Sequence, residues 1–198
     1  MQNTSDFSHL TPDVVINAVE DALDVECSSL CRPLNSYINR VYEVALEDDG
    51  GSLVVKFYRP GRWSRAALQD ELDFLDELSK DEVPVVAPLP SPEGDLLHEL
   101  GDTSFAVFPK KGGRPLDEPT MKDWEQLGRL IGRMHVVGAR NEPKDRIHLH
   151  PDESTVEHLD FTLDSGTVCS KYLSAYEDAV NGIIDLVDPM FDDVATQR

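Results

Sequence analysis

The sequence lacks a long hydrophobic run. Its apolar stretches are only a few residues long, whereas a membrane-spanning helix needs about 20. The start of the chain, MQNTSD, also lacks the basic and apolar regions of a secretory signal. We therefore expect no membrane partner and a cytoplasmic location. The hydrophobic content of 40% and charged content of 28% are typical of a globular protein.

Positive charge is scarce as well. The chain has 18 Lys and Arg residues against 38 Asp and Glu residues, a net charge of −20. Such a surface repels a polyanion, which argues against a nucleic-acid partner. A site for nucleotide phosphates would need its own local positive group. Lys56 is a candidate for that group.

Cysteine is too rare and too irregular for a zinc site. The chain has three cysteines, Cys27, Cys31 and Cys169, without a second Cys/His pair at finger-like spacing. We expect free thiols in a reducing compartment. His148-Leu149-His150, with Asp152 and Glu153, contains metal-binding residue types, but no second ligand cluster accompanies it. A solvated loop is the favoured interpretation, and we expect no metal site in this chain.

The stretch Leu53–Pro60 (LVVKFYRP) is the most informative part of what is present. Its β-branched and aromatic residues follow a Gly-Gly turn and precede Pro-Gly, which predicts a strand after a hairpin turn. Strand side chains alternate between faces, so Lys56 shares a face with Tyr58. Val55 and Phe57 then occupy the opposite face. An edge-strand lysine that discourages aggregation is the alternative interpretation of Lys56.

Glu71 gives Lys56 a possible partner. It lies in a predicted helix capped by Ser64, whose apolar positions are Ala67, Leu68, Leu72, Phe74, Leu75 and Leu78. Protein kinases use a strand lysine paired with a carboxylate on the following helix to hold the ATP α- and β-phosphates. The order of Lys56 and Glu71 favours the same ion pair here.

Other local signals complete residues 1–108. Thr11-Pro12-Asp13 predicts a helix start, and the apolar spacing ends near Val25. Further strands are expected at Leu30–Leu34 (interrupted by Pro33), at Val41–Leu46, at Leu96–Leu100 and at Thr103–Phe108. With the Lys56 strand, this makes about five strands and two helices, hence an α+β small lobe with an antiparallel sheet.

The segment Pro109–Pro115 (PKKGGRP) is the best boundary in the sequence. Beyond it the pattern is mostly helical. One helix carries an apolar stripe formed by Trp124, Leu127, Leu130, Ile131, Met134 and Val137, with Gly128 and Gly132 permitting close approach.

Later in the chain, residues 139–153 resemble a loop, a weak helix follows from Ser154, and a stronger helix runs from Tyr172 and stops at Pro189. We predict an ATP-binding lobe at 1–108, a hinge at 109–117 and a partial helical lobe at 118–198.

A polar turn, Asn35–Arg40 (NSYINR), precedes the first hairpin strand. A kinase places its phosphate-covering loop there, although this turn has no Gly-x-Gly. Backbone amides, the Ser36 hydroxyl and the Asn39 amide are suitable donors to phosphate oxygens. A plain surface turn is the alternative.

Several motifs together resemble the stress response kinase A group of bacterial Ser/Thr kinases. These kinases share the fold of aminoglycoside and choline phosphotransferases. The similarity runs from about Leu10 to His135. The matching segments are PLNSYINRVY (33–42), VVKFYRPGRW (54–63), DEVPV (81–85), FAVFP with GGR (105–114) and GRLIGRMH (128–135).

The resemblance implies a protein-kinase-like fold, ATP and Mg²⁺ as cofactors, an unknown protein substrate, and a role in surviving envelope or oxidative stress. By position, Lys56 would hold the phosphates and Glu71 would orient Lys56. The loop residues Asn35, Ser36, Tyr37 and Asn39 would cover the phosphates. The hinge residues Phe108, Pro109 and Lys110 would pair with the adenine edge. His135 would be architectural.

The departure from the family pattern is severe. The catalytic loop, His-Gly-Asp followed by Asn, and the later Asp-x-Asp that binds magnesium do not occur in the sequence. The pattern would place the catalytic aspartate and the metal ligands just beyond Arg198. We therefore expect no catalytic residue in this chain and interpret it as the N-terminal part of a kinase, inactive by itself. The face where further structure would pack is a possible dimer interface.

Three other interpretations stay open. A small-molecule kinase acting on an amino alcohol, a sugar or an antibiotic would share the ATP motifs. A non-catalytic nucleotide-binding regulatory module would need only the small lobe, and a gene that ends at Arg198 would favour it. A generic α+β domain without a ligand would require the order of Lys56, Glu71 and the hinge to be coincidence.

Overall fold

The computed structural model describes residues 7–47, 50–113 and 117–191, apart from the side chain of Asp152. The chain divides into two compact units. The first runs to Asp145 and contains the sheet, and the second begins at Arg146.

Some of the sequence predictions fall outside the described residues. The predicted turn residues Asp48 and Asp49 and the predicted boundary residues Arg114 and Pro115 are among them. Arg198, the position beyond which the catalytic aspartate and the metal ligands are expected, also lies outside the described residues. The structure therefore does not test the expectation attached to Arg198, and it stays a prediction.

Helix α1 (Pro12–Leu23) begins where its local signals place it. The Thr11 side chain accepts the N–H of Val14 at 3.4 Å, and Pro12 occupies the first helical position. The helix ends at Asp24, whose φ of 52° is left-handed. Capping chemistry is local, which is why the sequence predicted the start correctly and the end to within two residues.

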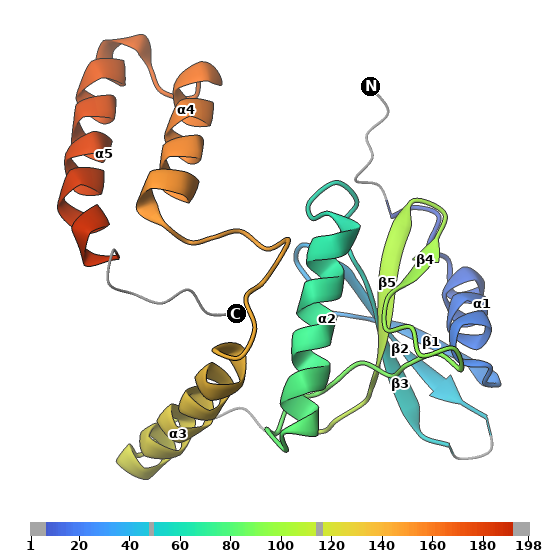
Figure 1. Cartoon of the computed structure of the whole chain (residues 1–198). Coiled ribbons are helices and arrows are strands. Elements are labelled where there is room, and N and C mark those ends of the chain that lie inside the picture. Colours follow the sequence, from blue (N-terminus) through green and yellow to red (C-terminus); the bar gives the residue numbers. More distant parts are fainter. Residues whose placement is uncertain (1–6, 48–49, 114–116, 192–198) are drawn as a thin grey trace. The chain divides into compact units, whose positions relative to one another are not determined.

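A five-stranded antiparallel sheet forms the centre of the first unit, in the order β1-β2-β3-β5-β4 (Figure 1). The strands are β1 (Cys27–Leu34), β2 (Arg40–Leu46), β3 (Ser52–Phe57), β4 (His98–Leu100) and β5 (Thr103–Pro109). Strand β3 is central, and Lys56 lies opposite Val41 of β2 and Ala106 of β5. A central strand excludes the edge-lysine interpretation of Lys56.

Three strand predictions need correction. Strand β4 begins at His98 rather than at Leu96. Strand β1 is not a short piece broken at Pro33 but runs from Cys27, with Pro33 opposite Tyr42. Strand β1 lies at the sheet edge, where a residue without an N–H is tolerated. Strand β3 ends at Phe57 rather than extending to Pro60.

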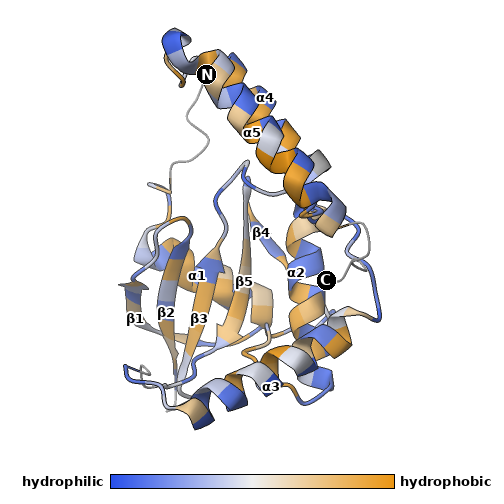
Figure 2. Cartoon of the chain, turned by 90° about the vertical axis from the view of Figure 1, so that its left-hand side faces the viewer, coloured by the Kyte–Doolittle hydropathy of each residue, from blue (hydrophilic) through white to orange (hydrophobic). Residues whose placement is uncertain are grey.

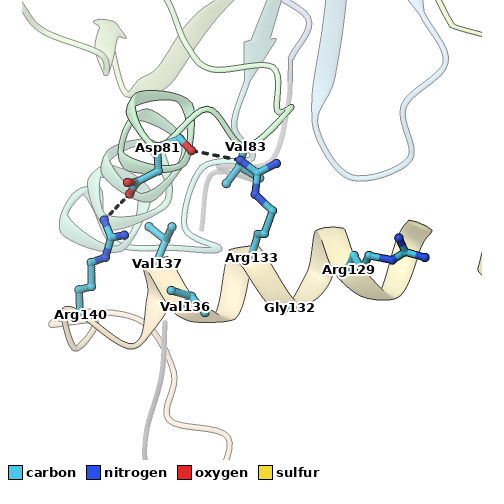
Figure 3. Close-up of a pocket in the computed structure, with 8 residues that line it drawn as sticks. All are labelled: Asp81, Val83, Arg129, Gly132, Arg133, Val136, Val137 and Arg140. Atoms are coloured by element: carbon cyan, nitrogen blue, oxygen red, sulfur yellow. Dashed lines mark hydrogen bonds and ion pairs between the residues drawn. The ribbon is translucent and has the colours of Figure 1, made fainter. Parts of the chain in front are cut away.

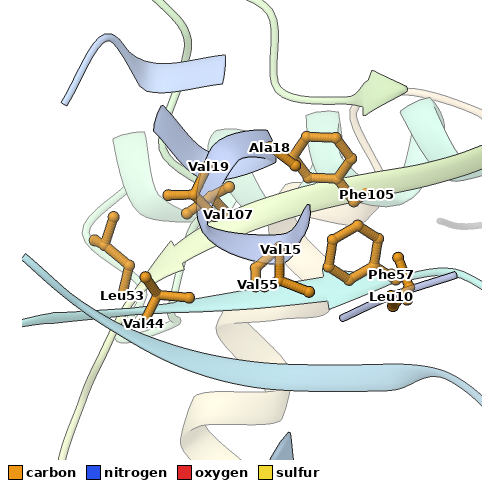
Figure 4. Close-up of a cluster of buried hydrophobic side chains, with 10 residues drawn as sticks. All are labelled: Leu10, Val15, Ala18, Val19, Val44, Leu53, Val55, Phe57, Phe105 and Val107. Carbon is orange, nitrogen blue, oxygen red and sulfur yellow. The ribbon is translucent and has the colours of Figure 1, made fainter. Parts of the chain in front are cut away.

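Helices cover both faces of the sheet, with α1 on one side and α2 (Arg65–Lys80) on the other (Figure 1). The α1 side forms a buried core whose members are Leu10, Val15, Ala18, Val19, Val44, Leu53, Val55, Phe57, Phe105 and Val107 (Figure 4). On the α2 side, Leu68 and Leu72 pack with Tyr58 and Ala106. The strand alternation predicted around Lys56 is confirmed.

Helix α3 (Met121–Gly138) follows β5 in the same unit. Thr120 and Asp123 form a capping box at its start. The close approach expected at Gly128 and Gly132 is absent, because an added Cβ would meet no described atom within 4 Å at either position. Hydrophobic and hydrophilic residues are interleaved along α3 (Figure 2), and its side chains Met121, Trp124, Leu127 and Ile131 are exposed. A dimer interface on this face stays a prediction.

The second unit contains α4 (Val156–Asp164) and α5 (Leu173–Val187). A π-helical turn, Pro151–Thr155, precedes α4, so the predicted loop is shorter than expected. Single 3₁₀ turns flank α5 at Ser170–Tyr172 and at Asp188–Met190. Helix α5 stops just before Pro189, as the sequence predicts. Among the described residues, no helix is both long and apolar enough to cross a membrane.

Candidate functional site

The predicted ion pair is present on the α2 side of the sheet. Lys56 Nζ lies 2.8 Å from Glu71 Oε1, and the Tyr58 hydroxyl donates to the same oxygen at 3.2 Å. The Lys56 and Glu71 side chains are 27% and 26% exposed. The pair is therefore shielded on most sides, yet a ligand can reach it from solvent.

Local sequence explains why these two side chains meet. Lys56 points away from the α1 core because its neighbours Val55 and Phe57 point into it. Glu71 lies three residues after Leu68 and one before Leu72, both of which are buried against the sheet. Residues three apart on a helix share a face, so Glu71 also faces the sheet.

An apolar patch surrounds Lys56. In an antiparallel pair, residues directly opposite share a face. Val41 lies opposite Lys56, and Val54, which is two residues before Lys56, lies opposite Phe108. We call Val41, Val54 and Phe108 the apolar patch. All three side chains are partly buried, so each keeps some exposed apolar surface on the face that carries Lys56.

Glu43 is a buried charged residue that the sequence reasoning missed. It lies opposite Val54 on the face that carries the apolar patch, and it is 3% exposed. Lys110 Nζ contacts Glu43 Oε1, and Arg32 Nε donates to Oε2 at 2.8 Å. Hydrogen bonds from Lys110 and then from Arg32 lower the pKa of Glu43 to about 2. The only feature of the sequence that pointed to a buried, paired Glu43 was an acidic residue among the apolar residues of β2.

The predicted hinge residues lie at the end of β5. The Lys110 N–H donates to the Ser52 carbonyl at 3.2 Å, so residues 110 and 52 form a hydrogen-bonded pair across β5 and β3. Such pairs alternate along an antiparallel ladder, so the Pro109 carbonyl points away from β3. Strand β4 pairs with β5 only as far as Phe105. Of the predicted hinge groups, the Pro109 carbonyl is thus the one directed to the other edge of β5.

The Asn35–Arg40 turn is braced by its own polar groups. The Ser36 hydroxyl donates to the Asn39 carbonyl at 2.9 Å, and Asn39 Oδ1 accepts the Arg59 N–H at 3.2 Å. Tyr37 is 96% exposed. The Ser36 hydroxyl, expected to donate to a phosphate, is therefore engaged in a hydrogen bond within the turn.

A separate hollow of about 320 Å³ lies between α3 and the chain that follows α2 (Figure 3). Its polar lining consists of Asp81, Arg129, Arg133 and Arg140. Arg140 forms an ion pair with Asp81, and Arg133 donates to main-chain carbonyls of the same segment. These arginines are thus engaged with the protein itself.

The described residues do not fit a magnesium site. Within them, no group of three or more His, Cys, Asp or Glu residues is arranged to hold a metal ion. In the segment first considered for a metal, His148 pairs with Glu153 at 3.1 Å and its ring stacks on His150.

Comparison with known proteins identifies the family. The model of the phosphotransferase enzyme family matches residues 30–164. The chain belongs to this family. The fold agrees with this membership, because a phosphotransferase, amicoumacin kinase, superposes with a TM-score of 0.57 at 24% identity, over 75% of this chain and 46% of that one.

Two relatives that carry the names of kinases are similar to most of the chain. The chain is 40% identical over 158 residues to the serine/threonine protein kinase RdoA of Salmonella typhimurium, covering 79% of this chain and 46% of that protein. It is 35% identical over 181 residues to stress response kinase A of Escherichia coli K12, covering 91% and 54% respectively. The chain spans about half the length of these relatives. The resemblance and the α+β kinase-like fold expected from the sequence are thereby confirmed.

Proposed function

We propose that this chain is the nucleotide-binding part of an ATP-dependent Ser/Thr protein kinase of the stress response. The observation that carries the proposal is the 2.8 Å Lys56–Glu71 pair on an accessible sheet face, in a member of the phosphotransferase enzyme family. The relatives' names support protein as the acceptor. Amicoumacin kinase, which has the same fold, was solved with AMP-PNP and Ca²⁺, and this supports a nucleotide and a divalent cation.

Each residue of the site has a role in this proposal. Lys56 places a positive charge where the α- and β-phosphates would lie, and Glu71 keeps its ammonium group aimed there. The adenine ring would lie on the apolar patch, and the Pro109 carbonyl would accept a hydrogen bond from the adenine amino group. The backbone of the Asn35–Arg40 turn would cover the phosphates.

The surrounding negative charge makes Lys56 more important. A nucleoside triphosphate that approaches a chain of net charge −20 is repelled at long range. Arg32 and Lys110 lie on the same sheet face but are held by Glu43. We therefore assign the phosphates to Lys56, although Glu71 partly neutralises its charge.

We also propose a domain organisation for the chain. Residues 1–108 would form the ATP-binding lobe in the cytoplasm, residues 109–117 the hinge and residues 118–198 part of the helical lobe. The catalytic aspartate and the ligands of the Mg²⁺ that accompanies ATP would follow Arg198, since the sequence up to that residue contains neither motif. A small-molecule acceptor is the second candidate, favoured by the structural similarity to amicoumacin kinase.

Hydrogen exchange with and without ATP tests the location of the site. We expect slower exchange in residues 35–41, 54–58 and 107–111, because these surround Lys56 and the apolar patch. Exchange in α5 should not change. Protection confined to the hollow at Arg133, with none in β3, would contradict the proposed site.

The acceptor is tested with radiolabelled ATP. The 198-residue chain should transfer no measurable phosphate, because no His-Gly-Asp or Asp-x-Asp motif occurs in its sequence. Transfer to serine or threonine by the gene product that contains this chain, and none to an aminoglycoside or amino alcohol, would support the protein-kinase assignment. The reverse result would favour the second candidate.

A further inference from the structure

The residue beside Glu71 has a contact that the nucleotide site does not explain. Asp70 is 9% exposed, and its Oδ2 accepts the main-chain N–H groups of Lys144 at 2.9 Å and Asp145 at 2.8 Å. Two amide donors on one carboxylate oxygen form a charge-assisted anchor. Asp145 is the last residue of the first unit's continuous sequence, so the anchor lies at the end of that unit.

A second anchor holds the other end of α2. Arg133 Nη2 donates to the carbonyl of Glu82 at 2.8 Å and to that of Asp81 at 3.2 Å, and Arg140 forms an ion pair with Asp81 (Figure 3). Glu82 has a φ of 57°. A residue with a side chain rarely adopts this left-handed conformation, and here the Arg133 guanidinium binds its carbonyl.

Apolar packing joins the same two segments. Leu78 of α2, Val83 just beyond it and Val137 of α3 are buried in one cluster. Residues 133–145, which we call the anchoring segment, therefore contact α2 at the Asp70 position and at its C-terminal end. Two contacts separated along a helix restrict both its tilt and its rotation.

The rotation of α2 determines where Glu71 points. Successive residues of an α-helix are about 100° apart around its axis, since 3.6 residues make one turn. Asp70 and Glu71 are successive, so fixing Asp70 to the anchoring segment fixes the direction of Glu71. In the structure this direction brings Glu71 to 2.8 Å from Lys56.

We propose that Asp70 is a positioning residue that, with Arg133, keeps Glu71 paired with Lys56 before any nucleotide binds. Nucleotide binding would then not require α2 to move into place, because the anchoring segment holds it there. The assembly of the pair is a property of the chain alone. The effect of Asp70 on nucleotide affinity, in contrast, rests on the proposed function.

The first test needs no nucleotide. Acylation of lysines by an N-hydroxysuccinimide ester, followed by mass spectrometry, reports how well the Lys56 amine is protected. We expect Asp70→Ala to raise the labelling rate of Lys56 about fivefold, the range typical of side chains coupled to a site. Asp70→Asn keeps a carbonyl acceptor and should change the rate much less. Arg133→Gln should act in the same direction as Asp70→Ala.

Arg129→Ala is the matched control. Arg129 lines the same hollow as Arg133, but it pairs with Glu125 on its own helix at 2.9 Å. The Arg129→Ala substitution should leave the labelling rate of Lys56 unchanged. Circular dichroism and urea unfolding identify any variant that fails to fold. Unchanged Lys56 labelling in folded Asp70→Ala, or in folded Arg133→Gln, would overturn the proposal.

The second test uses ATP and a double-mutant cycle. Asp70→Ala should weaken ATP binding about fivefold in the parent chain and should have no further effect when Glu71→Gln is already present. Independent, additive losses would assign Asp70 a purely structural role and overturn the proposal. If Lys56→Ala leaves ATP affinity unchanged, the proposed function fails, whereas the labelling result still decides the positioning role.

Discussion

At the scale of single residues, Glu43 links stability to pH. Its pKa is lowered from 4.5 to about 2 by the hydrogen bonds from Lys110 and Arg32. The folded state thus favours the carboxylate, and this stabilisation is complete above the ordinary pKa. It is lost as the pH falls from about 4.5 towards 2. We expect the free energy of unfolding, measured by urea titration, to fall across this window.

Glu43→Gln should make that fall shallower, because the amide does not titrate. Glu99→Gln is the control, since Glu99 pairs with Arg65 at 2.9 Å where both side chains are half exposed. The control should retain the wild-type pH dependence. An unchanged slope in Glu43→Gln would show that the three-residue cluster does not govern acid sensitivity.

The thiols offer a second test at this scale. Burial raises the pKa of Cys27 to about 11, with further contributions from Glu20 and Cys31, and burial also raises the pKa of Cys31. Only the thiolate reacts with iodoacetamide, so both should be alkylated slowly at neutral pH. Exposed Cys169 should be alkylated first, as peptide mass spectrometry would show. Equal rates at Cys27 and Cys169 would contradict the partial burial of Cys27.

Sequence reasoning found some of these residues and missed others for a physical reason. Lys56 and Glu71 were predictable because a strand followed by a capped helix determines both faces locally. Glu43 was not, since its partners Arg32 and Lys110 lie 11 and 67 residues away. Asp70 was missed for the same reason, because its partners at 144 and 145 are 74 and 75 residues distant.

At the scale of secondary-structure elements, local signals predicted the helix starts well. Thr11, Ser64 and Thr120 cap α1, α2 and α3. The sequence prediction made β1 too short because it treated Pro33 as an interruption. Pro33 is tolerated at the sheet edge, and which strand lies at the edge depends on the order of all the strands. The extent of a strand is a non-local property, whereas a cap is a property of four consecutive residues.

The cap of α2 can be tested directly. Ser64 Oγ accepts the Ala67 N–H at 3.0 Å, so Ser64→Ala should lower the free energy of unfolding by about 1 kcal/mol. Ser79→Ala, an exposed position near the other end of α2, should change it by less than about 0.5 kcal/mol. Urea titrations with equal m-values measure both. A Ser64→Ala effect no larger than the control would mean that packing alone sets the start of α2.

At the scale of the whole molecule, the first unit holds the proposed nucleotide site and the anchors of α2. The sequence predicted a sheet followed by helices, and the structure shows that order. The hinge at 109–117, inferred from a Gly/Pro/basic composition, stays a prediction. The compact units of the structure divide at Asp145 and Arg146. That division follows from which segments pack together, and α3 packs against α2 through contacts that composition does not reveal.

The central claim is that Lys56 binds the phosphates of ATP, and calorimetric titration of the chain with ATP tests it most directly. Removing one charge-assisted contact to phosphate costs roughly 1.5–3 kcal/mol, so Lys56→Ala should weaken binding about tenfold or more. Lys80→Ala is the control, because Lys80 pairs with Asp76 on the exposed side of α2. It should bind ATP like the parent chain. Equal ATP affinity in the parent chain, Lys56→Ala and Lys80→Ala would contradict the account.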